Sequence, residues 1–370
     1  MKSARIRIGV VGCGVIAQVA HLPVLRELDD RFELVALCDL DGARLDAVGE
    51  AFGVARRHVD LAELLTDPPD VVAVLTGGDH AEAVLASLEA GCDVFVEKPL
   101  TYSLAATDEI LAAAREHERF VLVGMTKRYD PGYDLAAAAV RDLRDLRCVD
   151  VRVLHPENDE YLAHLLIRRG DDEPRRPPER LLGREFDEHL RQAILRNQPV
   201  ESLAELAGSS EPERLFTAFW LLASCIHDVN ALRGVLGEPT EVVAAHGWAG
   251  GTELSAILAF GDDVRATYTW SFLPYLRHYV HRYSFLSTES RVHLEFPSPF
   301  LAAAPTVVEL EAMEGGRLHR THMTPSYDSP FKRELLELYE CVVRRRPPVT
   351  DAMDARRDLE VLHAIAAALR

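Results

Sequence analysis

Residues 6–17 read IRIGVVGCGVIA. The apolar run Ile6–Val11 leads into Gly12-Cys13-Gly14-Val15-Ile16-Ala17, and an amphipathic stretch over residues 18–28 follows. This is the strand–turn–helix pattern G-x-G-x-x-A. The first glycine permits the tight turn, the second lets the backbone approach a pyrophosphate, and the small third residue lets helix and strand pack closely. The stretch predicts a dinucleotide-binding Rossmann unit, with the cofactor held at Gly12, Gly14, Val15 and Ile16.

A second predicted strand, residues 32–38, ends at Asp39, 22 residues after Ala17. An acidic residue about 20 residues beyond the glycine turn bonds the 2′-hydroxyl of the adenosine ribose. A 2′-phosphate would meet Asp39 as a like charge, so NAD is favoured over NADP, although Arg44 could accommodate a phosphate. The alternative is that Asp39 is the N-cap of a helix predicted over residues 42–52.

The stretch VFVEKPL, residues 94–100, has the form of a buried strand that ends in a charged pair and a proline. Ligands of open α/β sheets bind at the carboxyl ends of the strands. Pro99 restricts the backbone of Lys98, so the ammonium is aimed and can stabilise negative charge on a substrate oxygen. The alternative is an ordinary solvated Glu97–Lys98 pair.

Strands and helices alternate through the first third of the chain. Further strands are predicted over residues 54–57, 71–75, 92–96 and 120–123, and helices over 61–65, 81–90 and 103–117. This rhythm predicts a doubly wound parallel sheet in a first domain over residues 1–128.

Composition narrows the class of protein. The 370 residues suggest two domains, and 48% hydrophobic residues with a mean hydropathy near zero describe a soluble globular chain. We find no apolar run of about 18 residues and no signal peptide, so we expect a cytoplasmic protein with no membrane partner. A net charge of −18 argues against nucleic acid. Six scattered cysteines without a C-x-x-C pair predict neither a disulfide framework nor a metal site.

Several motifs together resemble the Gfo/Idh/MocA family of oxidoreductases (glucose–fructose oxidoreductase, inositol dehydrogenase, rhizopine catabolism). They are the glycine turn followed by His21-Leu22-Pro23, Asp39, the loop from Thr76 to His80, Glu97-Lys98-Pro99, and Lys127-Arg128-Tyr129-Asp130-Pro131. The resemblance implies a second α/β domain, residues 129–370, with a large open, mostly antiparallel sheet. It also implies a nicotinamide cofactor and a sugar or cyclitol-like substrate. A sheet of six or seven strands has one face for the first domain and one for a partner subunit, so we expect a homodimer or homotetramer formed through it.

The resemblance also implies roles for individual residues. Lys98 would bind the cofactor ribose and the reacting oxygen, and the other cofactor contacts would come from Thr76, His80, Glu97 and Arg128. A predicted long helix over residues 215–236 contains Ser224-Cys225-Ile226-His227-Asp228-Val229-Asn230, which resembles the family's H-D-x-D-x-x-R segment. His227 would be the general acid/base, a role that suits an imidazole. The substrate side would include Arg128, Tyr129 and Asp228. The alternative for His227 is a core histidine.

Two positions depart from the family pattern. Ala223 stands where an aspartate often precedes the histidine by one helical turn, and Asn230 replaces the second aspartate. Two other functions therefore stay open. One is a catalytically weak NAD(P)-binding sensor or regulatory protein, and the other is a hydrolase or epimerase that uses transient oxidation.

The second half contains an insertion at about residues 157–212. Its charged, proline-rich part, residues 171–180, is followed by predicted helices over 184–196 and 201–207. It is either a tolerated surface insertion, or a lid or oligomer contact that contributes Arg or His groups to the substrate mouth. Strands are predicted over residues 148–154, 242–248, 254–260, 266–272, 278–286, 291–296, 306–313 and 317–323. Two helices, residues 329–345 and 354–369, end the chain, and the last can pack back on the first domain.

Overall fold

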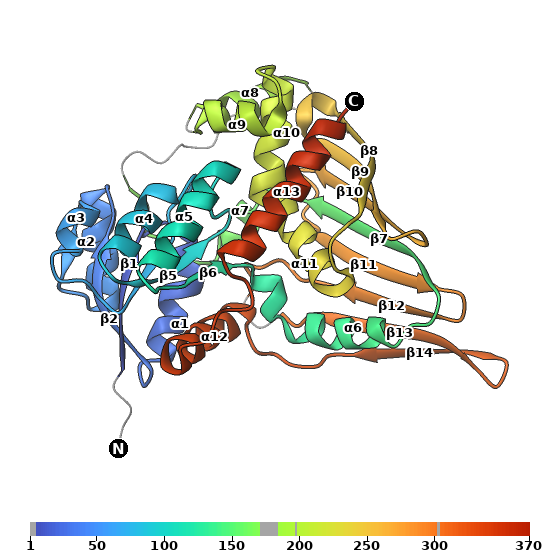
Figure 1. Ribbon diagram of the computed structural model, residues 1–370, viewed down its shortest axis with the longest axis horizontal. Coiled ribbons are helices and arrows are strands. Elements are labelled where there is room, and N and C mark those ends of the chain that lie inside the picture. Colours follow the sequence, from blue (N-terminus) through green and yellow to red (C-terminus); the bar gives the residue numbers. More distant parts are fainter. Residues whose placement is uncertain (1–4, 171–183, 197, 302–303) are drawn as a thin grey trace. The chain divides into compact units, whose positions relative to one another are not determined.

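The computed structural model describes residues 5–170, 184–196, 198–301 and 304–370 (Figure 1). The chain forms two compact units. The first comprises Met1–Met125, the described part of residues 165–180, and Phe331–Arg357, and the second contains the rest. The chain first crosses between units at Met125, close to residue 128, and later returns twice to the first unit.

The first unit contains a six-stranded, entirely parallel sheet in the order β3-β2-β1-β4-β5-β6. Its strands are β1 (Ile6–Val11), β2 (Phe32–Cys38), β3 (Arg57–His58), β4 (Val71–Val74), β5 (Asp93–Glu97) and β6 (Val121–Gly124). Its helices are the π-helical turn η1 (Ala17–His21), α1 (Leu22–Glu27), α2 (Gly42–Phe52), α3 (Leu61–Leu64), α4 (Ala81–Glu89) and α5 (Leu104–Glu116). The doubly wound prediction is confirmed, and the strand order reverses between β1 and β4, where ligands of such sheets bind.

One strand begins further along the sequence than predicted. The strand expected over residues 54–57 forms at Arg57–His58. Gly53 ends α2 in the left-handed conformation, and the N–H of Val54 still bonds to the carbonyl of Gly49. The helix cap therefore occupies the residues that would have started the strand.

Helix α12 (Pro330–Arg344) explains one of the chain's returns to the first unit. It places Phe331, Leu335 and Leu338 in the same buried cluster as the residues of β1 and α1. The helix therefore completes the core of the first unit, although it lies far along the sequence.

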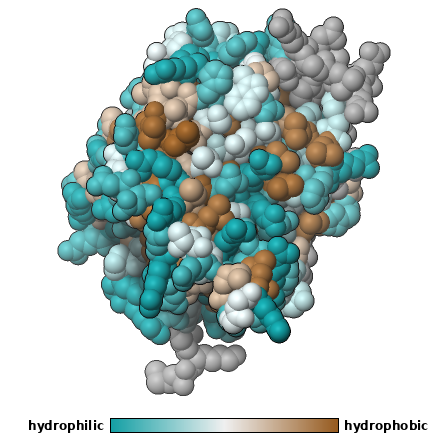
Figure 2. Space-filling model, turned by 90° about the vertical axis from the view of Figure 1, so that its right-hand side faces the viewer, coloured by the Kyte–Doolittle hydropathy of each residue, from teal (hydrophilic) through white to brown (hydrophobic). Residues whose placement is uncertain are grey.

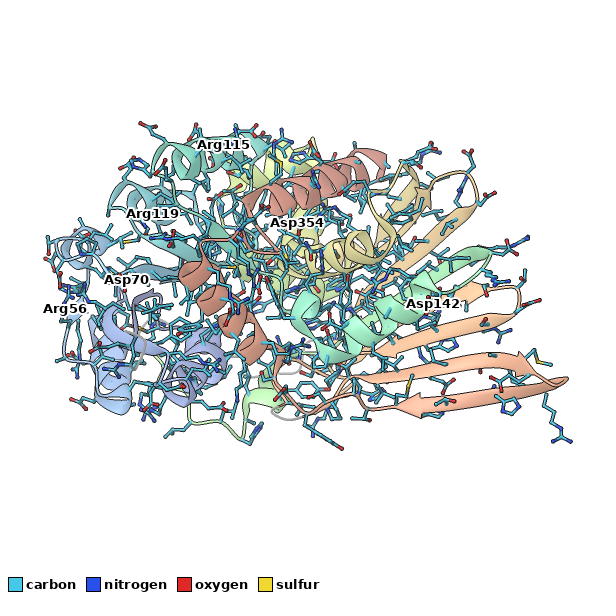
Figure 3. All side chains as sticks on the ribbon, turned by 60° about the horizontal axis from the view of Figure 1, so that its bottom comes forward. Arg56, Asp70, Arg115, Arg119, Asp142 and Asp354 are labelled. Carbon is cyan, nitrogen blue, oxygen red and sulfur yellow. The ribbon has the colours of Figure 1, made fainter. Side chains whose placement is uncertain are left out.

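The amino ends of the strands carry ordinary hydrogen bonds and ion pairs. Asp70 precedes β4 and accepts a bond from the backbone of Arg7, while Arg56 pairs with Asp67 at 2.7 Å. Figure 3 labels Asp70, Arg56 and Arg119, the last of which precedes β6. The glycine turn and the loops after β4 and β5 lie at the opposite, carboxyl edge.

The second unit contains an eight-stranded sheet in the order β14-β13-β12-β11-β7-β10-β9-β8. The strands are β7 (Leu146–His155), β8 (Glu241–Trp248), β9 (Glu253–Phe260), β10 (Val264–Phe272), β11 (Val280–Ser287), β12 (Ser290–Glu295), β13 (Val307–Glu314) and β14 (Arg317–Met323). Only β7 and β10 pair in parallel among these strands. The predicted open, mostly antiparallel sheet is confirmed.

Helices cover one face of this sheet (Figure 1). They are α6 (Pro131–Arg141), α10 (Pro212–Trp220) and α11 (Ile226–Leu236), with short turns η2 (Thr126–Tyr129), η3 (Leu221–Cys225) and η4 (Ala249–Gly251) nearby in the chain. Figure 2 shows the side of the molecule at the other face, where hydrophobic residues are scattered among hydrophilic ones. The homo-oligomer expected through this sheet stays a prediction. Helix α13 (Ala352–Ala368) ends the chain.

The insertion is helical where the structure describes it. It contains α7 (Asp159–Leu162), α8 (Arg184–Leu195) and α9 (Val200–Ala207), so the two predicted helices are confirmed. Helix α9 buries Leu203, Leu206 and Ala207. The charged, proline-rich residues 171–180 lie outside the described residues.

The predicted long helix is one continuous helical segment, Pro212–Leu236, interrupted by the π-helical turn η3. It is long and apolar enough to span a membrane by length and composition, so the expectation that no such stretch occurs is corrected. Asp228 and Arg233 interrupt its apolar run. Because 72% of its most apolar window is buried inside the protein, it has the character of a core helix.

Candidate active site

The glycine turn follows β1 at the switch point of the parallel sheet. Gly12 has φ +94°, and a Cβ there would lie 2.7 Å from the backbone nitrogen of Thr76. Its N–H donates to the carbonyl of Cys38 at 2.8 Å. A Cβ on Gly14 would meet no atom within 4 Å, and the helical backbone begins at the next residue, Val15. The turn therefore has tight support beneath Gly12 and open space beside Gly14, which fits an approaching pyrophosphate.

The two glycines should respond differently to alanine. We expect Gly12→Ala to destabilise the protein by roughly 2–4 kcal/mol, because the new Cβ combines an unfavourable φ with a backbone clash. We expect Gly14→Ala to leave the melting temperature unchanged but to raise the dinucleotide Kd by about tenfold or more, because its methyl fills the open space. Thermal unfolding and fluorescence titration measure both effects. A Gly14→Ala variant that binds dinucleotide normally would contradict this assignment.

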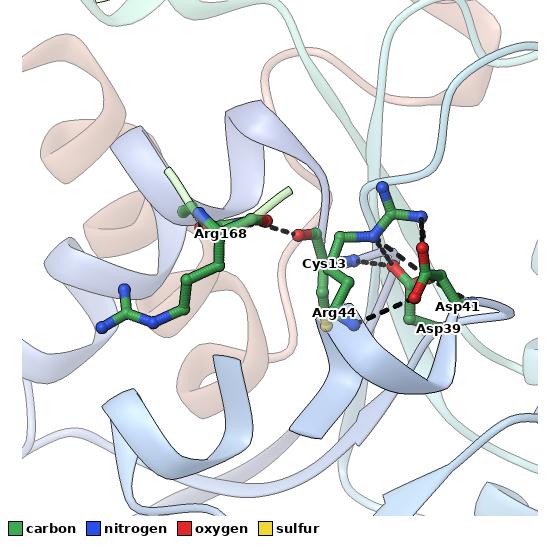
Figure 4. A network of polar contacts seen from close by, with 6 residues as sticks. Cys13, Asp39, Asp41, Arg44 and Arg168 are labelled. Atoms are coloured by element: carbon green, nitrogen blue, oxygen red, sulfur yellow. Dashed lines mark hydrogen bonds and ion pairs between the residues drawn. The ribbon is translucent and has the colours of Figure 1, made fainter. Parts of the chain in front are cut away.

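Asp39 joins the end of β2 to the glycine turn. Its buried carboxylate accepts the N–H of Cys13 at 2.7 Å and that of Asp41 at 2.9 Å. The guanidinium of Arg44 lies beside both carboxylates and bonds Asp39 at 3.1–3.3 Å (Figure 4). The alternative that Asp39 caps α2 is wrong, because the cap is Asp41, which accepts the N–H of Arg44. The Asp39 carboxylate therefore ties the end of β2 to the glycine turn.

A segment that is distant in the sequence also contacts the helix that follows the glycine turn. The side-chain amide of Gln18 donates to the carbonyl of Cys13 at 2.8 Å and to that of Arg168 at 2.9 Å. Its oxygen accepts the N–H of Arg168 at 2.8 Å. No local pattern in the sequence signals this contact, because the two residues are 150 positions apart.

Two loops at the carboxyl edge are tied together. The ring nitrogens of buried His80 lie 2.6 Å from the carbonyl oxygen of Pro99 and 2.8 Å from that of Thr76. The carboxylate of Asp79 accepts the N–H of Tyr102 at 2.9 Å. Both ties hold the loop after β4 against the loop after β5, in which half-buried Lys98 lies. His80, predicted to line the cofactor pocket, therefore supports the loop that carries Lys98.

Glu97 lies beneath Lys98 in the core. Its carboxylate contacts the ring of His21 at 2.7 Å and accepts the N–H of Lys98 at 3.3 Å. Burial would raise the pKa of Glu97, but the hydrogen bond and charge of His21 outweigh it and lower that pKa. Glu334 of α12 is completely buried, and neither of its oxygens has a hydrogen-bond partner among the described residues. Burial, reinforced by the charge of Glu97, raises the pKa of Glu334 well above its ordinary value.

Glu334 should make stability depend on pH. In the unfolded chain it ionises near its ordinary pKa of about 4.5, whereas the folded state keeps its proton to higher pH, so its contribution is lost as pH rises. We expect Glu334→Gln to melt like the parent near pH 4.5 and a few degrees higher at pH 8. The control is Glu340→Gln on the same helix, where Glu340 pairs with Arg344. A melting difference that does not grow with pH would contradict the assignment.

The second unit contains a buried polar cluster centred on Asp228 of α11. Its carboxylate contacts Lys127 Nζ at 2.6 Å, His281 Nε2 at 2.5 Å and Tyr268 OH at 2.9 Å, and it also accepts a bond from Tyr283 OH. Asp228 is 1% exposed. Four side chains from three elements (η2, β10 and β11) therefore surround one carboxylate.

The charged groups of this cluster shift one another's pKa values. Burial would raise the pKa of Asp228, but His281 and Lys127 lower it far below its ordinary value. Burial lowers the pKa of Lys127 and of His281, against the opposing effect of Asp228. The hydroxyl of Tyr279 contacts the other ring nitrogen of His281 at 2.6 Å, which fixes the ring. The cluster is a compensated buried ion group in which each polar atom has a partner.

His227 lies beside this cluster in the chain, in the first turn of α11, and is half-buried. The π-helical turn η3, which contains Ala223, precedes it, and such turns are frequent at functional sites. Asn230 donates to Asp358 at 2.8 Å, and Arg233 pairs with the same carboxylate. An aspartate at 230 would face Asp358 as a like charge, which accounts for the asparagine.

The structure brings the predicted residues together within each unit. Gly12, Gly14, Val15, Ile16, Asp39, Thr76, His80, Glu97 and Lys98 lie at the carboxyl edge of the parallel sheet, and Arg128, Tyr129, His227 and Asp228 lie on η2 and α11. Sequence reasoning missed Asp79, Gln18, Tyr268 and the pairing of Lys127 with Asp228. The alternation of Tyr279, just before β11, with His281 and Tyr283 on β11 was the available signal for the cluster.

Comparisons with known proteins agree with this architecture. A family model described as "Oxidoreductase family, NAD-binding Rossmann fold" matches residues 6–125. Inositol 2-dehydrogenase 3 of Saccharopolyspora erythraea is 39% identical over 132 residues, which are 35% of this chain and 38% of that protein. Myo-inositol 2-dehydrogenase of Thermotoga maritima is 33% identical over 37% of this chain and 41% of its own length. The chain thus matches about two fifths of the length of these relatives.

Solved structures resemble the chain over its whole length. The 3-ketoreductase KijD10 from Actinomadura kijaniata, in complex with NADP, has a TM-score of 0.72 at 20% identity and covers 99% of this chain and 98% of its own. UDP-N-acetylglucosamine 3-dehydrogenase from Acidithiobacillus ferrooxidans has a TM-score of 0.72 at 16% identity, with the same coverage. At these identities the likeness shows the fold. Over residues 6–125 the chain is thus similar to the NAD-binding Rossmann domain of the Gfo/Idh/MocA oxidoreductases.

Proposed function

We propose that this protein is an NAD-dependent oxidoreductase that acts on a secondary alcohol or ketone of a sugar or cyclitol-like compound. The observation that carries the proposal is the glycine turn after β1, closed by Asp39, on the same sheet edge as the Lys98 loop. The names of the matched relatives, inositol dehydrogenases and a D-apiose dehydrogenase, support this substrate class.

The first unit would hold the dinucleotide. The N–H groups of Val15 and Ile16, at the start of the helical segment, bind the pyrophosphate, and Asp39 accepts hydrogen bonds from the adenosine ribose. Thr76 lies beneath the turn and borders the same space. The bound nicotinamide supplies the acceptor or donor of hydride.

The protein groups would move the proton and stabilise charge. The ammonium of Lys98 donates a hydrogen bond to the reacting oxygen, and His227 takes the hydroxyl proton during oxidation and returns it during reduction. Arg128 and Tyr129 would contact the substrate. Asp228, predicted as a substrate ligand, is surrounded by four side chains. We therefore assign it a positioning role, in which it holds the side chains of Lys127 and His281 in place.

The absorbance of the reduced cofactor at about 340 nm tests the activity. Purified full-length protein is mixed with NAD or NADP and with inositols, pentoses, hexoses and nucleotide sugars, while dinucleotide binding is measured separately. Cofactor reduction with at least one polyol supports the proposal. Tight dinucleotide binding with no turnover on any compound would contradict it and favour a sensor, the function that Ala223 leaves open.

Asp39 should control the choice between NAD and NADP. We expect NAD to bind more tightly than NADP. Asp39→Asn should reduce the ratio of the Kd for NADP to the Kd for NAD by about tenfold, because the carboxylate that repels the 2′-phosphate disappears and Arg44 can pair with that phosphate. The control is Asp46→Asn on α2, where Asp46 is exposed and pairs with Arg57. An unchanged ratio in Asp39→Asn would contradict the assignment of the ribose site.

A further inference from the structure

A row of histidine and glutamate side chains crosses three strands of the large sheet. Register places His293 of β12 opposite Glu309 of β13, and Glu309 opposite His322 of β14. Their sequence neighbours Val292, Leu294 and Val308 are buried, and α6 packs on β12 and β13. Because side chains alternate along a strand, the row lies on the face opposite α6.

The atoms of this row and of Glu311 are close enough to share one ion. One ligand atom from each of His293, Glu309 and Glu311 lies within 4.8 Å of the other two. His322 Nε2 lies 2.8 Å from a carboxylate oxygen of Glu309. Bonds of about 2.0–2.2 Å to a central ion require only a small closing of this group. A hollow of about 100 Å³ is lined by Arg282, His293, Glu295, Val307, Glu309 and His322.

Neighbouring groups orient the ligands. The Nδ1 atom of His293 contacts the hydroxyl of Ser284 at 2.8 Å, which leaves Nε2 directed toward Glu311 at 3.8 Å. An outer hydrogen bond of this kind sets the tautomer of metal-binding histidines. Glu311 is 5% exposed and is held by Arg320 at 2.7 Å and Arg291 at 3.1 Å. Glu309 pairs with His322 rather than with an arginine among the described residues, so it keeps charge for a cation.

We propose that His293, Glu309, Glu311 and His322 form a binding site for one divalent first-row transition metal ion, for which Zn²⁺ is the probe. Imidazole nitrogen with carboxylate oxygen favours such ions over Mg²⁺ or Ca²⁺, which prefer oxygen ligands alone. The ion would link β12, β13 and β14 at the edge of the sheet that β14 forms. The sequence predicted no metal site because the ligands are dispersed over three strands without a short spacing motif.

Calorimetric titration of the chelator-treated full chain with ZnCl₂ tests the site. We expect one Zn²⁺ per chain, and a Kd that rises about tenfold or more in both His293→Ala and Glu309→Gln. Binding should weaken from pH 8 to pH 5.5, because ligand imidazoles must lose their protons. Circular dichroism checks that each variant is folded, and the conservative Glu309→Gln keeps the shape of the side chain.

Two variants control for other zinc ligands. His319→Ala removes an exposed histidine of β14 that lies opposite Ala312 of β13 and outside the row. Cys148→Ser removes the exposed cysteine of β7. Neither should change the Kd. Absence of stoichiometric binding, or binding that survives both His293→Ala and Glu309→Gln, would overturn the proposal and leave the row as a ladder of ion pairs.

Discussion

Changing Lys98 to alanine should lower kcat by about 10²- to 10³-fold on any substrate that the protein turns over. The ammonium would stabilise the negative charge that develops on the reacting oxygen, and alanine offers no donor there. Dinucleotide binding should weaken much less, because the glycine turn and Asp39 hold most of that ligand. Steady-state kinetics and a fluorescence titration of dinucleotide separate the two effects.

Two further variants sharpen this test. Lys332→Ala removes a lysine of the same unit that pairs with Glu27 on the surface, and it should leave kcat unchanged. Lys98→Arg keeps the charge but changes a compact ammonium into a planar fork, so it should recover only part of the rate. If Lys98→Ala retains the parental kcat, the lysine takes no part in the reaction.

The surroundings of Lys98 show how it would be held for this task. Burial of Glu97 against His21 fixes the end of β5, and the contacts of His80 and Asp79 fix the loop that follows. These contacts restrict the backbone on both sides of the lysine. A donor whose position is set before the substrate arrives costs little reorganisation during the reaction.

Local patterns made the first unit predictable from sequence. A β run, G-x-G-x-x-A and an acidic residue after the next strand each occupy a few neighbouring positions, so Gly12, Gly14 and Asp39 could be assigned directly. The contacts between Gln18 and Arg168, or between Asp79 and Tyr102, join residues that only the folded chain brings together. Helix α12 illustrates the same limit, because its apolar face fits either unit until its packing partners are known.

The Asp228 cluster lay beyond sequence reasoning for a different reason. The family pattern placed Asp228 beside a catalytic histidine and so suggested a substrate contact. In the fold, β10 and β11 supply Tyr268, His281 and Tyr283, and η2 supplies Lys127. Adjacent residues on a helix point in different directions, so a role assigned to His227 says little about the side chain next to it.

Removal of the Asp228 charge should cause a large loss of stability in the second unit. We expect Asp228→Asn to lower the free energy of unfolding by on the order of 3–5 kcal/mol, because Lys127 would lose its compensating charge in a buried site. Denaturant unfolding followed by fluorescence measures the loss. The control is Asp134→Asn on α6, an exposed position, which should change stability by less than about 0.5 kcal/mol.

The dependence on pH distinguishes a lost charge from a merely altered shape. The pKa of Asp228 lies well below its ordinary value in the folded chain, so its stabilisation is present above the unfolded pKa of about 4 and is lost as pH falls. The stability gap between the parent and Asp228→Asn should therefore be largest near pH 7 and shrink toward pH 3. A gap that stays constant over this range would mean that asparagine disturbs packing, and that the carboxylate charge contributes nothing to folding.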